Sequence, residues 1–222
     1  MNSQNVVIAI DGPAGAGKST VSKLLAKMLN IRYLDTGAMY RCLAFKAIEA
    51  GLTVNDGDEA SELLKGLEIQ FGTGDPQPVF LNGVEVTADI RSPQVGEYAS
   101  ALSQFSPIRK QMVDRQKKMV ADGGVVLEGR DVTTVVAPDA SLKVYLTASL
   151  EERAKRRLNE FVDAGAATSF LTVRDQILQR DHRDITRDDS PLTVAEGAEV
   201  IESAGMSPLQ VAETIVSLLA TR

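Results

Sequence analysis

Residues 12–19 read Gly12-Pro13-Ala14-Gly15-Ala16-Gly17-Lys18-Ser19, a glycine-rich segment that ends in a lysine and a serine. This spacing matches the phosphate-binding pattern G-x-x-x-x-G-K-[ST]. The glycines let successive backbone N–H groups curl around phosphate oxygens, and the start of the next helix adds partial positive charge. We expect Lys18 to be exposed on the loop, where its positive charge can bridge the outer phosphates of a nucleotide. The Ser19 hydroxyl can hold Mg²⁺. The motif, closed by Thr20, therefore predicts a nucleoside triphosphate site.

The sequence on both sides of this motif predicts an α/β fold. Before it, Val6–Ile10 is a continuous apolar run, which is typical of a strand buried on both faces of a parallel sheet. After it, apolar residues recur at helical spacing. Strands alternating with helices predict a doubly wound parallel sheet. The other expected strands are Arg32–Leu34, Val125–Leu127, Leu142–Leu146 and Ala198–Ile201, and helices are expected over Ala38–Ala50 and from Ser207-Pro208 onward.

One region interrupts this alternation. Between Leu67 and Val86 the pattern favours three short strands, and Asn82-Gly83 between the last two is a strong hairpin signal. We interpret the region from about Asp58 to Arg91 as an antiparallel insertion in a single domain that spans residues 1–222. Helices are expected to restart at Ser92-Pro93 and Ser106-Pro107.

A second unusual region lies between Ser149 and Pro191. It is dense in charges of both signs and contains the weak spacer Gly165-Ala166-Ala167. We predict a mobile helical lid over residues 149–191.

Composition narrows the class of protein. The 222 residues are 44% hydrophobic and 24% charged, and 24 Lys and Arg against 30 Asp and Glu give a net charge of −6. A negative chain argues against a nucleic-acid partner. One cysteine and one histidine exclude an internal disulfide and a multi-histidine metal centre. The first apolar run is too short for a signal peptide or a membrane span, so we expect a cytoplasmic protein.

Several classes of protein use such a loop. The GTPase patterns D-x-x-G and N-K-x-D do not occur in the sequence. A kinase of small molecules needs further arginines for a second anion and a lid that excludes water. The chain has such a set at predicted loops and helix starts: Arg41, Arg109, Arg130, Arg180, Arg183 and Arg187. A kinase acting on another monophosphate or on a non-nucleotide acceptor, and a regulatory nucleotide switch, stay open at this point.

Four motifs carry a specific resemblance. They are the loop itself, Leu34-Asp35-Thr36-Gly37-Ala38-Met39-Tyr40-Arg41, Glu128-Gly129-Arg130-Asp131 with its continuation to Ala140, and Arg180-Asp181-His182-Arg183-Asp184-Ile185-Thr186-Arg187 followed by Ser190-Pro191-Leu192. In this order they resemble the bacterial cytidylate kinases, a P-loop nucleoside monophosphate kinase family, over essentially the whole chain.

The resemblance implies a five-stranded parallel core, a lid and an enlarged monophosphate-binding region. It implies transfer of a phosphoryl group from ATP to CMP or dCMP, with Mg²⁺, by a monomer. It places Arg41 and Arg130 at the phosphate of the monophosphate and brings Arg180 and Arg187 into contact with the ligands when the lid closes. The resemblance makes Lys18, Arg130 and Arg187 the catalytic residues. It places Thr36, Arg109 and Asp131 at the cytosine base, and Ser100 and Asp184 with Arg180 at the sugar. These residue types fit cytosine, because its amino group donates to a hydroxyl or carboxylate and its N3 and O2 atoms accept from an arginine.

Three residues depart from the family's pattern. Thr36 stands where serine is common, Glu128 where aspartate also occurs, and Thr133 where glycine is common. The first two changes keep a hydroxyl and a carboxylate. Thr133 is expected to stiffen its loop.

Overall fold

The computed structural model describes residues 5–163, 165 and 167–221. The chain forms two compact units. Unit 1 joins Met1–Tyr33 to Val120–Arg222, and unit 2 is Leu34–Met119. The boundary on the N-terminal side falls inside a strand, and each unit is described separately below.

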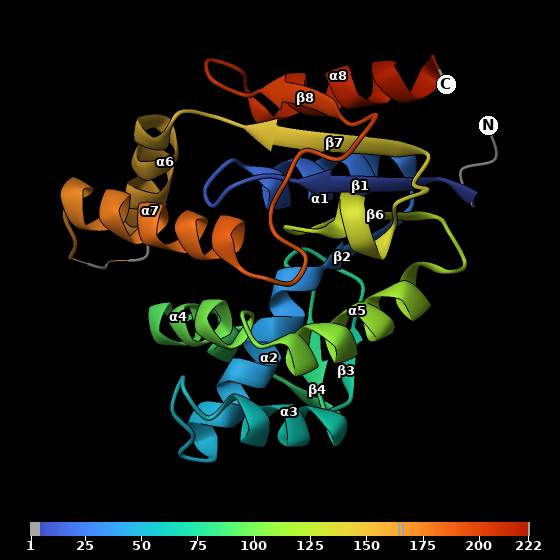
Figure 1. Ribbon diagram of the computed structural model, residues 1–222. Coiled ribbons are helices and arrows are strands. Elements are labelled where there is room, and N and C mark those ends of the chain that lie inside the picture. The colour runs from blue at the N-terminus through green and yellow to red at the C-terminus, as the bar shows by residue number, and fades with distance from the viewer. Residues whose placement is uncertain (1–4, 164, 166, 222) are drawn as a thin grey trace. The chain divides into compact units, whose positions relative to one another are not determined.

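Unit 1 is built on a five-stranded sheet with the order β2-β6-β1-β7-β8. Strand β1 is parallel to both of its neighbours, with Val7 opposite Val125 and Ile8 opposite Leu142. The parallel sheet predicted from the apolar runs is therefore confirmed (Figure 1). The strands are β1 (Val7–Asp11), β2 (Arg32–Asp35), β6 (Val125–Glu128), β7 (Leu142–Thr147) and β8 (Glu199–Glu202).

Two helices of unit 1 pack together beside this sheet. They are α1 (Lys18–Leu29) and α8 (Pro208–Ala220), and their apolar residues join those of β1 and β7 in one core. The start of α8 is as predicted, because the Ser207 hydroxyl accepts from the Gln210 N–H and the Gln210 side chain accepts from the Ser207 N–H. This core supports the end of β1, where the phosphate-binding motif begins.

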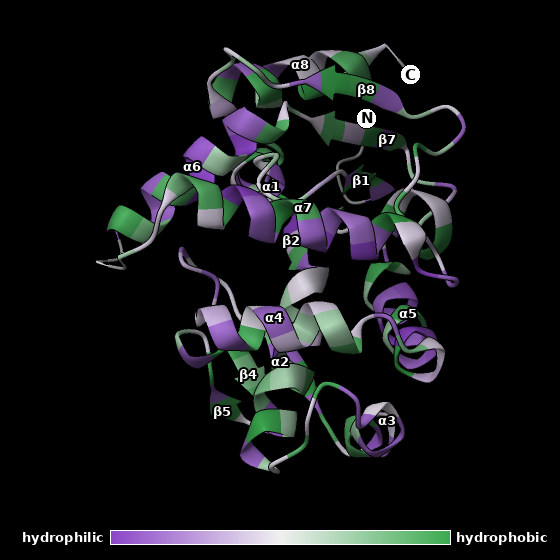
Figure 2. Ribbon diagram, turned by 60° about the vertical axis from the view of Figure 1, so that its left-hand side comes forward, coloured by the Kyte–Doolittle hydropathy of each residue, from purple (hydrophilic) through white to green (hydrophobic). Residues whose placement is uncertain are grey.

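The region predicted as a lid is helical. It forms α6 (Leu150–Asp163) and α7 (Phe170–Thr186), which pack against each other. Figure 2 shows α7 as largely hydrophilic, whereas β7 in the core is mostly hydrophobic. Within the predicted spacer, Ala166 lies outside the described residues. A short π-helical turn, η3 (Val132–Val136), follows β6.

Unit 2 contains the predicted antiparallel strands. They are β3 (Ile69–Phe71), β4 (Val79–Leu81) and β5 (Val84–Glu85), in the order β3-β4-β5. Asn82 and Gly83 have φ angles of 50° and 80°, which is the left-handed backbone that a tight two-residue hairpin requires. Sequence reasoning missed two elements inside the predicted insertion, the helix α3 (Gly57–Lys65) and the short 3-10 helix η2 (Asp89–Arg91).

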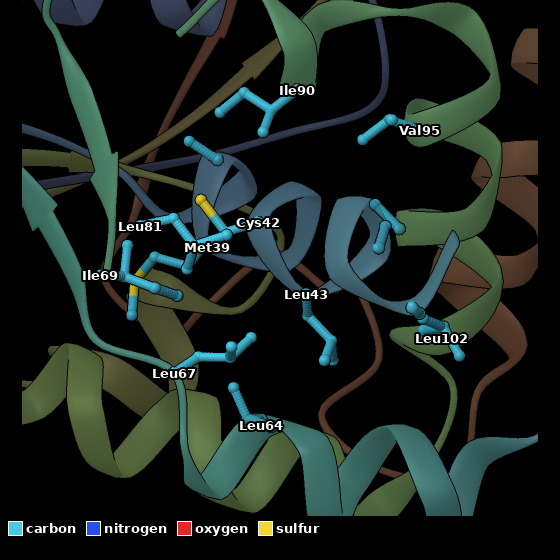
Figure 3. Close-up of a cluster of buried hydrophobic side chains, with 14 of the residues drawn as sticks. Met39, Cys42, Leu43, Leu64, Leu67, Ile69, Leu81, Ile90, Val95 and Leu102 are labelled. Carbon is cyan, nitrogen blue, oxygen red and sulfur yellow. The ribbon is translucent and has the colours of Figure 1, made fainter. Parts of the chain in front are cut away.

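The remaining elements of unit 2 surround one apolar core. They are α2 (Thr36–Glu49), the short 3-10 helix η2 (Asp89–Arg91), α4 (Pro93–Leu102) and α5 (Ser106–Val120). Figure 3 shows Met39 and Cys42 of α2 beside Ile69 and Leu81 of the sheet, with Leu64 of α3 nearby. The predicted helix starts at Ser92-Pro93 and Ser106-Pro107 are confirmed.

Among the described residues, no helix combines the length and apolar character needed to cross a membrane.

Candidate active site

The phosphate-binding motif connects β1 to α1 in unit 1, as predicted. Gly12, Gly15 and Gly17 have φ angles of 148°, 75° and 92°. A Cβ atom on Gly12 would lie 1.9 Å from the Leu146 carbonyl oxygen of β7. Only glycine fits there, because the loop starts in direct backbone contact with the neighbouring strand.

Lys18 is buried, contrary to the exposed position expected from the sequence, with 5% of its surface accessible. As the first residue of α1 it folds back over the loop, where Nζ donates to the Gly12 and Pro13 carbonyls at 2.7 and 2.8 Å. Burial, followed by repulsion from Arg130, lowers the pKa of Lys18 to about 7. A negative ligand in the loop would favour its charged form.

Ser19 meets a carboxylate from the next strand of the sheet. Its Oγ donates to Glu128 Oε1 at 2.5 Å, and the Tyr33 hydroxyl donates to the same oxygen at 3.1 Å. A hydroxyl beside a carboxylate is a donor set that Mg²⁺ accepts, usually with several waters. The donor types of this pair suit the metal position predicted at Ser19, and Glu128 is the carboxylate beside it.

Arginines and a carboxylate gather at the carboxyl end of β6. Arg130 Nε donates to Asp184 Oδ2 at 2.8 Å, and Arg187 Nη1 lies 3.5 Å from Asp184 Oδ1. Burial alone would raise the pKa of Asp184, but Arg130 and the nearby arginines outweigh it and hold the pKa below its usual value. Residues from two segments of the sequence are thus brought together as predicted.

Arg180 adds a further cation to this cluster. Burial, followed by repulsion from Arg130, lowers the pKa of its guanidinium to about 10. Within the part of the chain that the structure describes, Arg180 Nε has no hydrogen-bond partner. Lys18 is also repelled by Arg180, so these cations share one electrostatic environment. Such an environment favours a polyanion.

The first half of the predicted lid is attached to the loop. Arg153 of α6 donates to the Ala14 carbonyl at 2.9 Å and pairs with Asp181 of α7, whose other oxygen accepts from the Ala14 N–H at 2.9 Å. Arg156 donates to the Ala16 carbonyl at 3.2 Å. Sequence reasoning did not find this role for Arg153 and Arg156, since a charge-dense helix gives no signal of which charges face inward.

In unit 2, Asp35 organises the start of α2. Its Oδ1 accepts from the Ala38 N–H and its Oδ2 accepts from Arg91 Nη2, both at 2.9 Å. Thr36, the first residue of α2, is buried beside this cap. Sequence reasoning included Asp35 only in the motif and missed Arg91.

The other predicted residues of unit 2 stand on three helices. Arg41 of α2 donates to the Ile90 carbonyl at 2.9 Å. Arg109 of α5 is buried, donates to the Ser103 carbonyl at 3.1 Å and lies over the Tyr40 ring at 5.8 Å. Ser100 of α4 is buried, and its Oγ has no hydrogen-bond partner among the residues described. A buried hydroxyl in this state is suited to a ligand.

Asp11 and Asp131 are two buried carboxylates of unit 1 that lie close enough to repel each other. Asp131 is buried directly before η3. Asp11, which sequence reasoning did not single out, is fully buried at the end of β1, directly before Gly12. The sequence does contain a signal that could have identified Asp11, because ligands of open α/β sheets bind at the carboxyl ends of the strands and Asp11 is the last residue of β1. His182 is exposed and Cys42 is buried, as their expected non-catalytic roles require.

A glycine loop at the carboxyl end of the central strand of a parallel sheet, with a buried lysine and nearby arginines, defines a phosphotransferase of the P-loop kinase class. The family model for cytidylate kinase matches residues 8–221. The chain belongs to the cytidylate kinase family.

Individual relatives agree with this assignment. The chain is 43% identical to a cytidylate kinase of Caldicellulosiruptor saccharolyticus over 216 residues, covering 97% of this chain and 96% of the relative. It is 45% identical to a cytidylate kinase of Carboxydothermus hydrogenoformans, covering 96% and 95%. An uncharacterized protein from Eubacterium ventriosum shares the fold, with a TM-score of 0.58, 12% identity and coverage of 98% and 99%.

Proposed function

We propose that this family member transfers the γ-phosphoryl group of ATP to CMP or dCMP, giving ADP and CDP or dCDP. One observation carries the proposal. Buried Lys18 and half-buried Arg130 and Arg180 lie close enough together that, besides burial, repulsion from Arg130 lowers the pKa of both Lys18 and Arg180, while the carboxylates around Arg130 keep it charged. Phosphoryl transfer is catalysed mainly by positioning and by neutralising charge on the phosphates, which such a cluster supplies.

The donor nucleotide is held by residues Gly12 to Thr20. Backbone N–H groups of the loop bind the phosphates, and Lys18 moves from the Gly12 and Pro13 carbonyls to the phosphate oxygens. Mg²⁺ would be held by Ser19 and Glu128, where it neutralises phosphate charge when bound.

We assign three sets of residues to the acceptor nucleotide. Thr36, Arg109 and Asp131 recognise the base, Arg41, Arg130 and Arg187 the phosphate, and Ser100, Arg180 and Asp184 the sugar. Ser100 has the unoccupied hydroxyl that a sugar contact needs. Asp184 already accepts from Arg130, yet a carboxylate has lone pairs for a further donor.

In the reaction an oxygen of the CMP phosphate forms a bond to the γ-phosphorus while the bond from that phosphorus to the bridging β–γ oxygen breaks. The two oxygens lie in line, and ADP leaves with the bond's electrons. Lys18, Arg130 and Arg187 neutralise the charge on the moving group. No protein base is required, because the acceptor phosphate oxygen is already ionised at neutral pH. We further propose that residues 149–191 act as a lid, and that the protein works as a monomer in the cytoplasm where ATP is available.

A substrate panel tests this function. ADP release is followed with ATP and CMP, dCMP, UMP or AMP as acceptor. We expect CMP and dCMP to be used well and UMP poorly, because the O4 of uracil would face the Asp131 carboxylate as a second acceptor. A different preferred acceptor would contradict the proposal, and ATP turnover indifferent to every acceptor would indicate a nucleotide switch.

A variant tests the base contact. Asp131→Asn gains an amide donor for O4, so the ratio of kcat/KM values for CMP and UMP should fall by about tenfold. Equal losses with both substrates would give Asp131 a positioning role in place of base recognition.

A further inference from the structure

Asp11 accepts three hydrogen bonds from one short turn. The Val132 N–H donates to Oδ1 at 3.0 Å, and the N–H and hydroxyl of Thr133 both donate to Oδ2 at 2.7 and 2.6 Å. The Asp11 side chain has no exposed surface, and Thr133 is buried as well. These contacts join residues that are more than a hundred positions apart in the sequence.

The two ends of this contact lie next to the candidate active site. Asp11 directly precedes Gly12, whose backbone contacts β7. Thr133 lies in η3, two residues after Asp131 and three after Arg130. A π-helical turn is an uncommon conformation and needs specific support. The Asp11 carboxylate supplies it by satisfying N–H groups at the start of η3, where α-helical partners are missing.

The Thr133 hydroxyl matters because Asp11 is costly to keep ionised. Burial raises the pKa of Asp11 to about 6, and the nearby charge of Asp131 adds to this, whereas the hydrogen bonds from Thr133 and Val132 lower it. The other titratable groups that interact with Asp11 are Lys18 and Tyr145 of β7. A protonated Asp11 would present an O–H group where an acceptor is needed, so η3 would lose one of its supports.

We propose that Thr133 is a positioning residue: its hydroxyl holds the Asp11 carboxylate, which fixes the turn bearing Arg130 and Asp131 relative to the first residue of the phosphate-binding loop. The proposal rests on the proposed roles of Arg130 and Asp131. The Thr133 hydroxyl is the third hydrogen-bond donor to the Asp11 carboxylate. A glycine at position 133 would leave Asp11 with only the two backbone N–H donors.

The test compares Thr133→Val, which keeps the shape and removes the hydroxyl, with Thr133→Ser, which keeps the hydroxyl. We expect Thr133→Val to lower kcat/KM for CMP about tenfold and to move the acid-side midpoint of its pH profile up by about one unit, the effect of losing one charge-assisted hydrogen bond. Thr133→Ser should stay within about twofold of the parent at the same midpoint. Thr134→Val is the matched control, because the Thr134 hydroxyl donates to the Asp131 carbonyl at 3.3 Å and not to Asp11.

A second measurement does not depend on turnover. The Asp11 carboxyl resonance is titrated by ¹³C NMR in the intact parent and in each variant, with Thr133→Ala added in case valine disturbs packing. Its pKa should rise in Thr133→Val and Thr133→Ala alone. An unchanged Asp11 pKa, or a uniform loss of stability with an unchanged pH profile, would overturn the proposal. A parent that fails to phosphorylate CMP while the Asp11 titration behaves as expected would refute the proposed function and leave the Thr133–Asp11 contact standing.

Discussion

The candidate residues of unit 1 and unit 2 are held by different means. In unit 1 they are tied to side chains far along the chain: Ser19 to Glu128, Ala14 to Asp181, and Asp11 to Thr133. In unit 2, Arg41 and Arg109 donate to backbone carbonyls, on helices that pack around the apolar core of Figure 3. The candidate residues of unit 1 are therefore fixed by long-range side-chain partners, whereas Arg41 and Arg109 are fixed by backbone carbonyls on helices of a packed core. Loss of one partner should be costly in unit 1, whereas a ligand-binding group of unit 2 should be removable with its scaffold intact.

The largest effect is expected for Lys18→Ala. Its rate should fall by about 10³-fold or more, because the charge nearest the transferred group is lost. The protein should stay folded, since a buried lysine with a pKa lowered to about 7 contributes little favourable energy as a cation. Single-turnover kinetics and thermal melting check both parts, with Lys27→Ala on the exposed face of α1 as control. Activity within tenfold of the parent would contradict the role given to Lys18.

The next effect concerns stability in unit 1. Asp181→Ala leaves the buried Arg153 guanidinium without its carboxylate, so the free energy of unfolding should fall by about 3 kcal/mol. The double variant Arg153→Met, Asp181→Leu should recover much of this loss, because neither charge remains buried. Urea unfolding measures both. Glu160→Ala is the control, since its pair with Arg157 is largely exposed and should contribute less than about 1 kcal/mol. Equal losses at the two pairs would show that burial does not make the Arg153–Asp181 pair more costly to break than an exposed one.

A smaller effect is expected in unit 2 for Arg109→Met. kcat/KM for CMP should fall about fiftyfold through the loss of a charged hydrogen bond, with KM for ATP nearly unchanged. Arg109→Lys should not restore it, because an ammonium lacks the planar fork. Arg115→Met on the same helix is the control. Its guanidinium donates to the Leu64 and Leu67 carbonyls, so this variant should lose stability and keep kcat/KM. Equal losses of kcat/KM for Arg109→Met and Arg115→Met would contradict the role given to Arg109.

The smallest effect concerns the proposed lid. Arg157 and Arg174 pair with exposed acids, whereas Arg153 and Arg156 already bind the loop. Amide exchange in the first half of α7 should slow severalfold with an analogue that joins both nucleotides, and only slightly with either nucleotide alone, because closure needs phosphate contacts from both. Equal protection by CMP alone would make this region a fixed part of the acceptor site.

Much of the fold follows from local signals. The apolar run before Gly12, the Asn82-Gly83 hairpin and the serine caps at Ser92 and Ser207 each act within a few residues, so the sequence predicts the elements that they start or end. Helix α3 was missed because its first turn is rich in glycine and acidic residues, and its apolar positions are few.

The candidate site was less predictable than the fold. Residue types could be matched to phosphate and base chemistry, and the resemblance supplied their places. The hydrogen-bond partners of these residues could not be predicted. Glu128, Asp181 and Thr133 contact Ser19, Ala14 and Asp11 only because the fold brings together segments that are far apart in the sequence. The prediction that Lys18 is exposed was wrong because the fold as a whole arranges the loop carbonyls to which Lys18 donates.

The pairing of β1 has a consequence for how the protein is made. Strand β1 leaves the ribosome first, yet its neighbours start at Val125 and Leu142, after all of unit 2. At roughly 5–20 residues per second, this apolar strand waits on the order of ten seconds for a partner. Unit 2 has a continuous chain and its own core, so it can fold during that interval. During this interval the nascent chain would contain a folded unit 2 and an unpaired apolar strand β1. Binding of a chaperone to residues 6–11 would protect the chain from aggregation in this period.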